Sequence, residues 1–171
     1  EVGSDTRSFP DALRHALRQD PDVICIGEMR DLETISIALT AAETGHLVLA
    51  TLHTPSAMGT ISRIVDVFPA AQQEQVKVQL AATLTAVVTQ RLLPRADGRG
   101  RVLAAEVLVT NDAIRNLIRE QKLHQIHNAM VTGRGAGMQR LEDNLRTLLE
   151  QGAISRSVAA MAANDIRAIQ D

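Results

Sequence analysis

A strand–helix–strand pattern between residues 22 and 54 constrains the fold more than any other feature of this sequence. The apolar runs at residues 23–27 and 47–52 have the length and composition of strands that are buried on both faces. Between them, apolar side chains recur at helical spacing over residues 32–44, and Gly45 follows as a helix stop. Strands joined by one helix with short connections pair in parallel. We therefore expect an α/β fold in which a parallel-rich sheet is flanked by helices.

Further helices are predicted on both sides of this unit. One begins near Phe9 and continues to about residue 18, and Asp20-Pro21 ends it because the residue before proline avoids the α region. Two more are predicted over residues 56–67 and 70–90. The second carries an apolar stripe formed by Val76, Leu80, Leu84 and Val87.

The rest of the sequence predicts a hairpin followed by helices alone. The turn sequence ADGRG separates two strand-like segments at residues 89–95 and 101–109, which favours a β-hairpin. After Thr110 every segment has helical spacing. We therefore expect a core region over residues 1–109 and an all-helical C-terminal region over residues 110–171.

Composition and charge favour a cytoplasmic protein that does not bind nucleic acid. No apolar segment approaches the roughly 18 residues that a membrane span needs, and the only cysteine, Cys25, lies in an apolar run. The formal net charge is −2, and the aromatic residues are two Phe with no Trp or Tyr. A DNA-translocating ATPase would need basic patches or stacking side chains, which argues against that class. The chain begins at Glu1 without an initiator Met, so we expect a fragment of a larger protein.

Polar side chains follow both predicted strands, at the point where each strand ends. Glu28 follows the first strand, and Thr51, His53 and Thr54 follow the second. Carboxyl ends of neighbouring parallel strands meet at one edge of a sheet, so these side chains should converge. Glu28 is placed to reach Mg²⁺ or the attacking water beside a γ-phosphate, and His53 to hydrogen-bond that phosphate, with the threonines orienting it. A solvated loop acid and a loop or capping histidine are the alternatives that spacing leaves open.

Three further residues are candidates for nucleotide binding. His46 follows Gly45 and either belongs to the site or orients the turn between helix and strand. Arg14 and Arg18 lie four residues apart on one helix face, so they could reach a nucleotide bound by a neighbouring subunit, as arginine fingers do. A solvated helix face is the alternative for this pair.

Three segments together resemble the PilT family of type IV pilus ATPases. They are EVGSDTRSF, the long run ALRHALRQDPDVICIGEMRDLETISIALTAAETGHLVLATLHT, and AIRNLIRE. The resemblance extends from Glu1 to about Ile154. It implies a RecA-like P-loop ATPase core, of which this chain holds the C-terminal half, that uses ATP and Mg²⁺ and works as a hexameric ring. It also implies a location at the cytoplasmic face of the inner membrane, where the motor acts on a pilus platform protein to retract the pilus and drive twitching motility.

The resemblance also assigns roles to particular residues. It makes residues 1–9 the end of an Asp box, DVICIGEMRD an atypical Walker B with Glu28 as the catalytic acid and metal ligand, and residues 45–54 a His box. Gly27 stands where a standard Walker B often has its Mg²⁺-binding Asp. AIRNLIRE, at residues 113–120, resembles the retraction branch more than the extension or type II secretion branches, which remain the alternatives. Without the resemblance, this segment is an ordinary amphipathic helix whose Arg115, Arg119 and Glu120 are left for partners.

The sequence contains no phosphate-binding loop. Its two lysines, Lys77 and Lys122, follow Val76 and Gln121, so no Gly-Lys-Ser/Thr occurs. The backbone cradle and lysine that neutralise the β- and γ-phosphates are therefore absent from these 171 residues. We expect the isolated chain to hydrolyse almost no ATP. A non-catalytic module that joins a motor ring is the alternative reading of the chain on its own.

Overall fold

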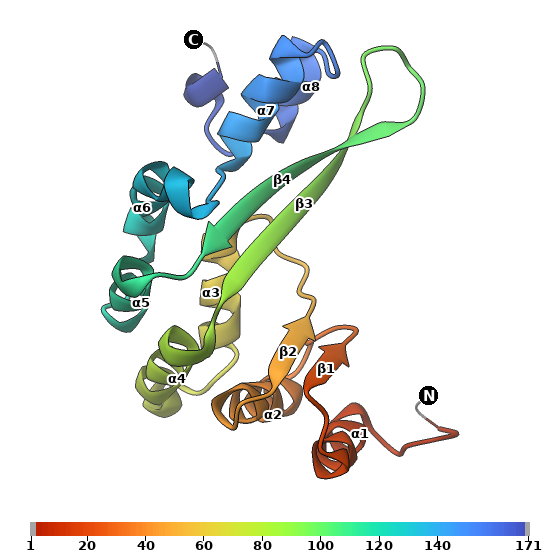
Figure 1. Cartoon of the computed structure of the whole chain (residues 1–171), viewed down its shortest axis with the longest axis vertical. Coiled ribbons are helices and arrows are strands. Elements are labelled where there is room, and N and C mark those ends of the chain that lie inside the picture. Colours follow the sequence, from red (N-terminus) through yellow and green to blue (C-terminus); the bar gives the residue numbers. More distant parts are fainter. Residues whose placement is uncertain (1–2, 170–171) are drawn as a thin grey trace.

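The computed structural model describes residues 3–169, so Glu1 and Val2, which open the predicted Asp-box segment, lie outside the described residues. A long β-hairpin runs from the helices α3, α4 and α5 to the C-terminal helices α7 and α8, while α1, α2, β1 and β2 lie beyond the opposite side of α3 and α4, which makes the molecule elongated (Figure 1). The elements are α1 Phe9–Ala16, η1 Leu17–Gln19, β1 Val23–Ile26, α2 Leu32–Glu43, β2 Leu47–Ala50, α3 Ala57–Asp66, α4 Ala70–Thr83, β3 Ala86–Pro94, β4 Arg101–Val109, α5 Asp112–Arg119, η2 Leu123–Gln125, α6 Ile126–Thr132, η3 Gly133–Ala136, α7 Leu141–Glu150, α8 Arg156–Ala162 and η4 Ile166–Ile169.

The predicted strand–helix–strand unit is confirmed. β1 and β2 pair in parallel, with Val23 opposite Leu47 and Ile26 opposite Ala50, and α2 connects them. Asp31 caps α2 by accepting a hydrogen bond from the Thr34 amide at 2.8 Å. One face of the strand pair packs against α1 and α2 through a small cluster made of Leu13, Ile24, Ile26, Ala38 and Ala41.

The opposite face of β1 and β2 is exposed, so the prediction of strands buried on both faces is wrong. Val23, Leu47 and Leu49 are 48%, 51% and 52% exposed, and Cys25 is also exposed. The cause is the small size of the sheet. Within residues 3–169 it has two strands, and the helices that pack on it cover the face opposite these four side chains. Apolar composition predicted the strands, but it could not say what covers them.

The predicted helix over residues 70–90 is too long. α4 ends at Thr83, Leu84 is extended, and β3 begins at Ala86. The β-branched residues Val87, Val88 and Thr89 lose side-chain freedom in a helix and pack well in a sheet. Here they pair with β4, where Val87 lies opposite Leu108. Val87, the last residue of the predicted helical stripe, therefore belongs to a strand and matches the helical spacing by coincidence.

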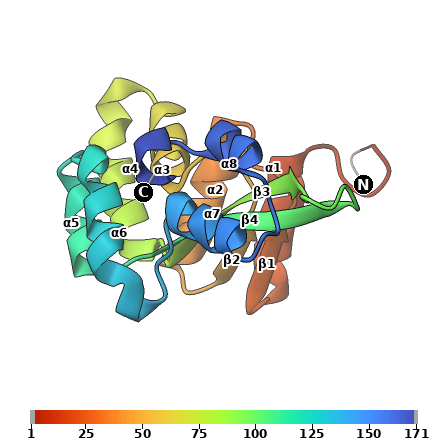
Figure 2. The same ribbon diagram turned by 90° about the horizontal axis from the view of Figure 1, so that it is seen from above.

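The hairpin of β3 and β4 separates two larger hydrophobic clusters. The end where Ala86 pairs with Val109 packs with α3, α4, α5 and α6. The end that carries the turn between β3 and β4 packs with α7 and α8. From above, α4, α5 and α6 lie together on one side of the molecule (Figure 2). The division between residues 109 and 110 stays a prediction. Apolar packing joins α5 and α6 to α3 and α4, and α7 and α8 to the far end of the hairpin.

The AIRNLIRE segment forms α5 from its second residue onward and the C-cap Glu120. Ile114 and Ile118 are fully buried, as the amphipathic pattern predicted. The Arg115 guanidinium donates to the carbonyl oxygens of Ala81 and Ala82, the second at 2.7 Å, and so binds carbonyls at the end of α4. Nη1 of Arg115 is therefore used within the chain, and a partner contact of Arg115 stays a prediction.

The described helices are short, and each packs through one face. The longest, α4, has 14 residues. Among residues 3–169 no helix has both the length and the apolar character that crossing a membrane would require.

Candidate functional site

Two hydrogen bonds join the loops that follow β1 and β2, one between backbone groups and one from a side chain. The Met29 amide donates to the Thr51 carbonyl oxygen at 3.0 Å. The Thr51 hydroxyl donates to the Gly27 carbonyl oxygen. These two bonds continue the parallel pairing beyond the strands and bring the two polar loops alongside each other.

Glu28 and His53 meet at this edge, as the sequence predicted. Glu28 Oε1 lies 3.2 Å from His53 Nε2, and Glu28 Oε2 lies 2.6 Å from a guanidinium nitrogen of Arg30. The Glu28 side chain is 25% exposed and the His53 side chain 81% exposed, so both can reach a ligand in solvent. An acid that faces solvent beside a histidine can accept a proton from water or coordinate a hard cation.

The electrostatics of this cluster keep Glu28 ionised. The hydrogen bond from Arg30 is the largest effect and lowers the pKa of Glu28; desolvation, the next in size, raises it, and the charges of Arg30 and His53 lower it again, so that the net shift is downward. The same pairing raises the pKa of Arg30. The carboxylate is therefore negatively charged at neutral pH, which is the form that a metal ligand or general base needs.

Arg30 is a site residue that the sequence reasoning missed. It lies two residues after Glu28 in a loop, where spacing does not determine which side chains face each other. The available signal was a cation two residues after the acid at the strand end. Its side chain is 77% exposed, so this ion pair is a surface interaction that solvent and a ligand can rearrange.

The structure places Thr54 and His46 away from the Glu28–His53 pair. The Thr54 hydroxyl hydrogen-bonds the Thr60 hydroxyl of α3 at 2.6 Å. His46 Nδ1 lies 3.1 Å from the Thr44 hydroxyl and 3.0 Å from the Ala41 carbonyl oxygen, at the end of α2. His46 therefore orients the turn between α2 and β2. A role of either residue in nucleotide binding stays a prediction.

The two candidate arginine fingers lie on α1 and on the 3-10 turn η1 that follows it. Arg14 pairs with Asp11 at 3.2 Å and with Glu33 at the start of α2. Arg18 is exposed at the end of the N-terminal helical segment. Arg14 could act on a neighbouring subunit only by exchanging these exposed partners, which costs little. An arginine-finger role of both residues stays a prediction.

The donor set suits a magnesium ion that binds mainly to phosphates. Residues 3–169 contain no group of three or more His, Cys, Asp or Glu side chains that could hold a metal alone. Mg²⁺ in nucleotide sites is commonly bound through one or two carboxylates, with phosphate oxygens and water as the other ligands. The single carboxylate of Glu28 fits that arrangement.

Comparisons with known proteins agree with this geometry. Residues 3–168 match the family model for "Type II/IV secretion system protein". The chain is 53% identical over 165 residues to a twitching motility protein of Neisseria gonorrhoeae, covering 96% of the chain and 44% of that relative. It is 54% identical over 159 residues to the type IV pilus retraction ATPase PilT of Pseudomonas aeruginosa, covering 93% of the chain and 46% of that relative. The chain thus spans less than half the length of these relatives.

Solved structures share the fold. A crystal structure of the pilus retraction motor PilT with bound ADP superposes with a TM-score of 0.89 at 55% identity, over 98% of this chain and 47% of that one. The ATPase DotB of Legionella pneumophila gives a TM-score of 0.82 at 34% identity, over 94% of this chain and 43% of that one. The arrangement of a parallel strand pair and surrounding helices is therefore the one found in these ATPases.

Proposed function

The chain belongs to the type II/IV secretion system protein family, and we propose that it carries the catalytic carboxylate of an ATPase motor that retracts type IV pili and so drives twitching motility. The observation that carries this proposal is the Glu28–His53 pair at the carboxyl edge of a parallel strand pair. Identity of 53–54% to twitching motility proteins over almost the whole chain supports retraction as the specific role.

In the proposed mechanism each residue at the edge has a separate task. Glu28 accepts a proton from the attacking water, or orients it, in the way that carboxylates beside γ-phosphates do. Arg30 pairs with the Glu28 carboxylate until nucleotide arrives. His53 hydrogen-bonds the γ-phosphate and responds to its loss, and Thr51 fixes the loop that presents His53. Mg²⁺, held by the phosphates and Glu28, would neutralise developing charge on the phosphoryl oxygens.

We further propose the architecture that the family resemblance implies. Residues 1–109 belong to a RecA-like ATPase core, and residues 110–171 form a helical C-terminal region. The motor is a hexamer in which Arg14 and Arg18 approach nucleotide bound by a neighbouring subunit. The ring works at the cytoplasmic face of the inner membrane against a pilus platform protein.

Deletion of the gene that encodes this chain tests the proposal directly. We expect cells without it to lose twitching while keeping extended surface pili, because retraction stops and extension continues. Twitching zones on agar and pilus counts by electron microscopy give the two readouts. Loss of the pili themselves would show an extension motor instead, and secretion defects with normal twitching would show a type II secretion ATPase.

The isolated 171-residue chain is expected to release almost no phosphate from ATP, because its sequence lacks a Gly-Lys-Ser/Thr loop. A phosphate-release assay with the purified chain measures this, and the purified Pseudomonas PilT serves as the positive control. Hydrolysis at the rate of that control, abolished by Glu28→Gln, would contradict the prediction. If the chain instead co-purifies with full-length subunits and lowers their activity, it acts as a non-catalytic module of the ring.

A further inference from the structure

The loop that carries His53 continues through Pro55 into α3. One arginine of the hairpin binds the end of this loop. Arg91 of β3 donates from Nη2 to the Pro55 carbonyl oxygen at 3.2 Å. The same nitrogen lies 2.7 Å from Asn164 Oδ1, and Nη1 donates to the Ala162 carbonyl oxygen. A single guanidinium thus joins the His53 loop to the end of α8. The planar fork of arginine suits this task, because it presents several donors in a fixed geometry.

The contacts continue beyond α8 into α7. The Asn164 and Asp165 amides donate to Glu142 Oε1 at 3.0 and 3.2 Å, and Glu142 is 1% exposed at the start of α7. The segment after α8 is therefore fixed from two sides, by Arg91 of the hairpin and by a buried carboxylate of α7. A displacement of α7 or α8 would move the acceptors that Arg91 uses.

The second strand of the hairpin holds the same helix start. Glu106 of β4 is 4% exposed, and its Oε1 accepts a hydrogen bond from the Ala57 amide at 2.6 Å. Ala57 is the first residue of α3. The Pro55–Ala57 segment is thus bound by β3 through Arg91 and by β4 through Glu106, while His53 lies two residues earlier in the chain.

We propose that Arg91 is a positioning residue that couples the His53 loop to the C-terminal helices α7 and α8. Movement of these helices and placement of His53 beside Glu28 are then linked through one side chain. The consequence for ATP hydrolysis rests on the function proposed above, whereas the coupling itself is a property of this chain. It gives a motor a direct connection between its C-terminal helices and its phosphate-sensing loop.

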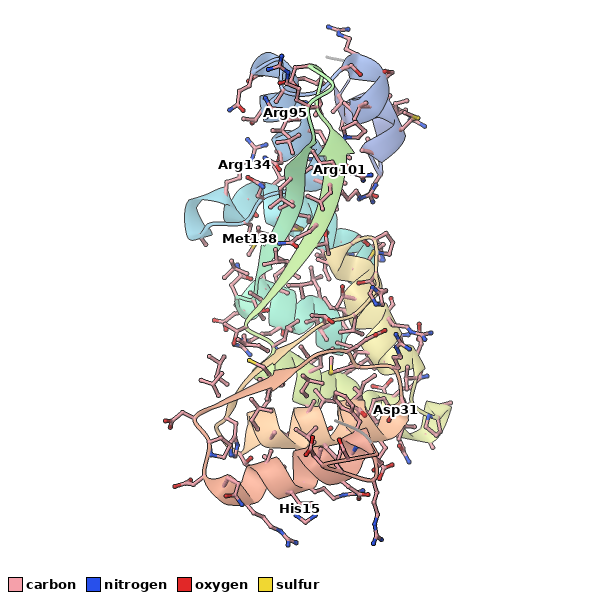
Figure 3. All side chains as sticks on the ribbon, turned by 90° about the vertical axis from the view of Figure 1, so that its right-hand side faces the viewer. His15, Asp31, Arg95, Arg101, Arg134 and Met138 are labelled. Carbon is pink, nitrogen blue, oxygen red and sulfur yellow. The ribbon has the colours of Figure 1, made fainter. Side chains whose placement is uncertain are left out.

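Hydrogen–deuterium exchange of the 171-residue chain tests the coupling. Arg91→Ala is expected to raise exchange about tenfold or more in two peptides at once, residues 51–60 and residues 156–165, because each loses a charge-assisted hydrogen bond. Peptide 70–83, which covers α4, should keep its protection. Arg95→Ala is the matched control, since the Arg95 side chain (labelled in Figure 3) pairs with Asp97 in the turn of the hairpin and contacts neither Pro55 nor Asn164. It should change neither peptide.

Asn164→Ala provides the reciprocal test and keeps Arg91 in place. If the coupling exists, this change beyond α8 also raises exchange in residues 51–60 and shifts the His53 ring resonance in a ¹H–¹³C spectrum. A role in local packing alone would alter residues 156–165 and leave the His53 loop unchanged, which would overturn the proposal. If Arg91→Ala unfolds the chain, seen as lost protection in α4, Arg91→Lys and Asn164→Ala decide the question. No ATP is present, so failure here is distinct from failure of the proposed function.

Discussion

Replacement of Glu28 by Gln at the gene's own locus should abolish twitching and leave the pili extended. Glutamine has nearly the same shape and can still face His53 and Arg30, but it cannot accept a proton from water and carries no charge for Mg²⁺. Loss of a general base and of a metal-binding charge typically lowers turnover by a factor of about 10²–10⁴. Twitching zones on agar and phosphate release by the motor purified from the same cells measure the effect.

Glu43→Gln is the matched control for this experiment. Glu43 is an exposed acid at the end of α2, and its carboxylate accepts a hydrogen bond from Gln79 at 3.0 Å, outside the strand-end cluster. The same change of charge at this position should leave twitching and phosphate release near normal. Normal twitching of the Glu28→Gln cells would show that Glu28 is not the catalytic acid, and cells without pili would point to extension.

The sequence predicted the centre of the candidate site because that centre depends on local patterns and one topological rule. Two apolar strands joined by a helix must pair in parallel, and the ends of parallel strands meet. This is sufficient to bring Glu28 and His53 together from positions 25 residues apart, and the structure confirms their contact. Their chemical roles stay predictions.

The contacts that support the site could not be predicted in the same way, because they join segments far apart in the chain. Arg91 and Pro55 are separated by 36 residues, and Glu106 and Ala57 by 49. For Glu106 a signal was available. Glu106 lies between Ala104 and Leu108 on the same face of β4, and both of these apolar residues are fully buried. An acid on the buried face of a strand predicts a buried polar contact, although not its partner.

Removal of the Glu106 carboxylate should be the most damaging change to the stability of the hairpin and α3. Glu106→Ala leaves the Ala57 amide without its acceptor in a buried region and opens a cavity. We expect a loss of about 2–4 kcal/mol in the free energy of unfolding. Glu106→Gln retains an oxygen that can accept this hydrogen bond, so its cost should be far smaller. Urea unfolding followed by circular dichroism measures both variants, and equal losses would contradict the importance of the Ala57 bond.

The pH dependence of stability separates the charge of Glu106 from its hydrogen bond. Burial raises the pKa of Glu106 from 4.5, and the charge of Glu142 raises it further, against hydrogen bonds from the Ala57 and Leu141 amides that lower it. A carboxyl group whose folded pKa is raised contributes stability that is fully present below its unfolded pKa and is lost as pH rises through the folded pKa. The wild-type chain should therefore lose part of its stability as pH rises from about 4.5, and Glu106→Gln should lose less over the same range. The variant gains relative to wild type with rising pH because its side chain has no charge to bury beside Glu142. If the free energy of unfolding changes with pH in the same way for both proteins, the prediction is contradicted. The ionised Glu106 carboxylate would then accept the Ala57 hydrogen bond without an electrostatic cost.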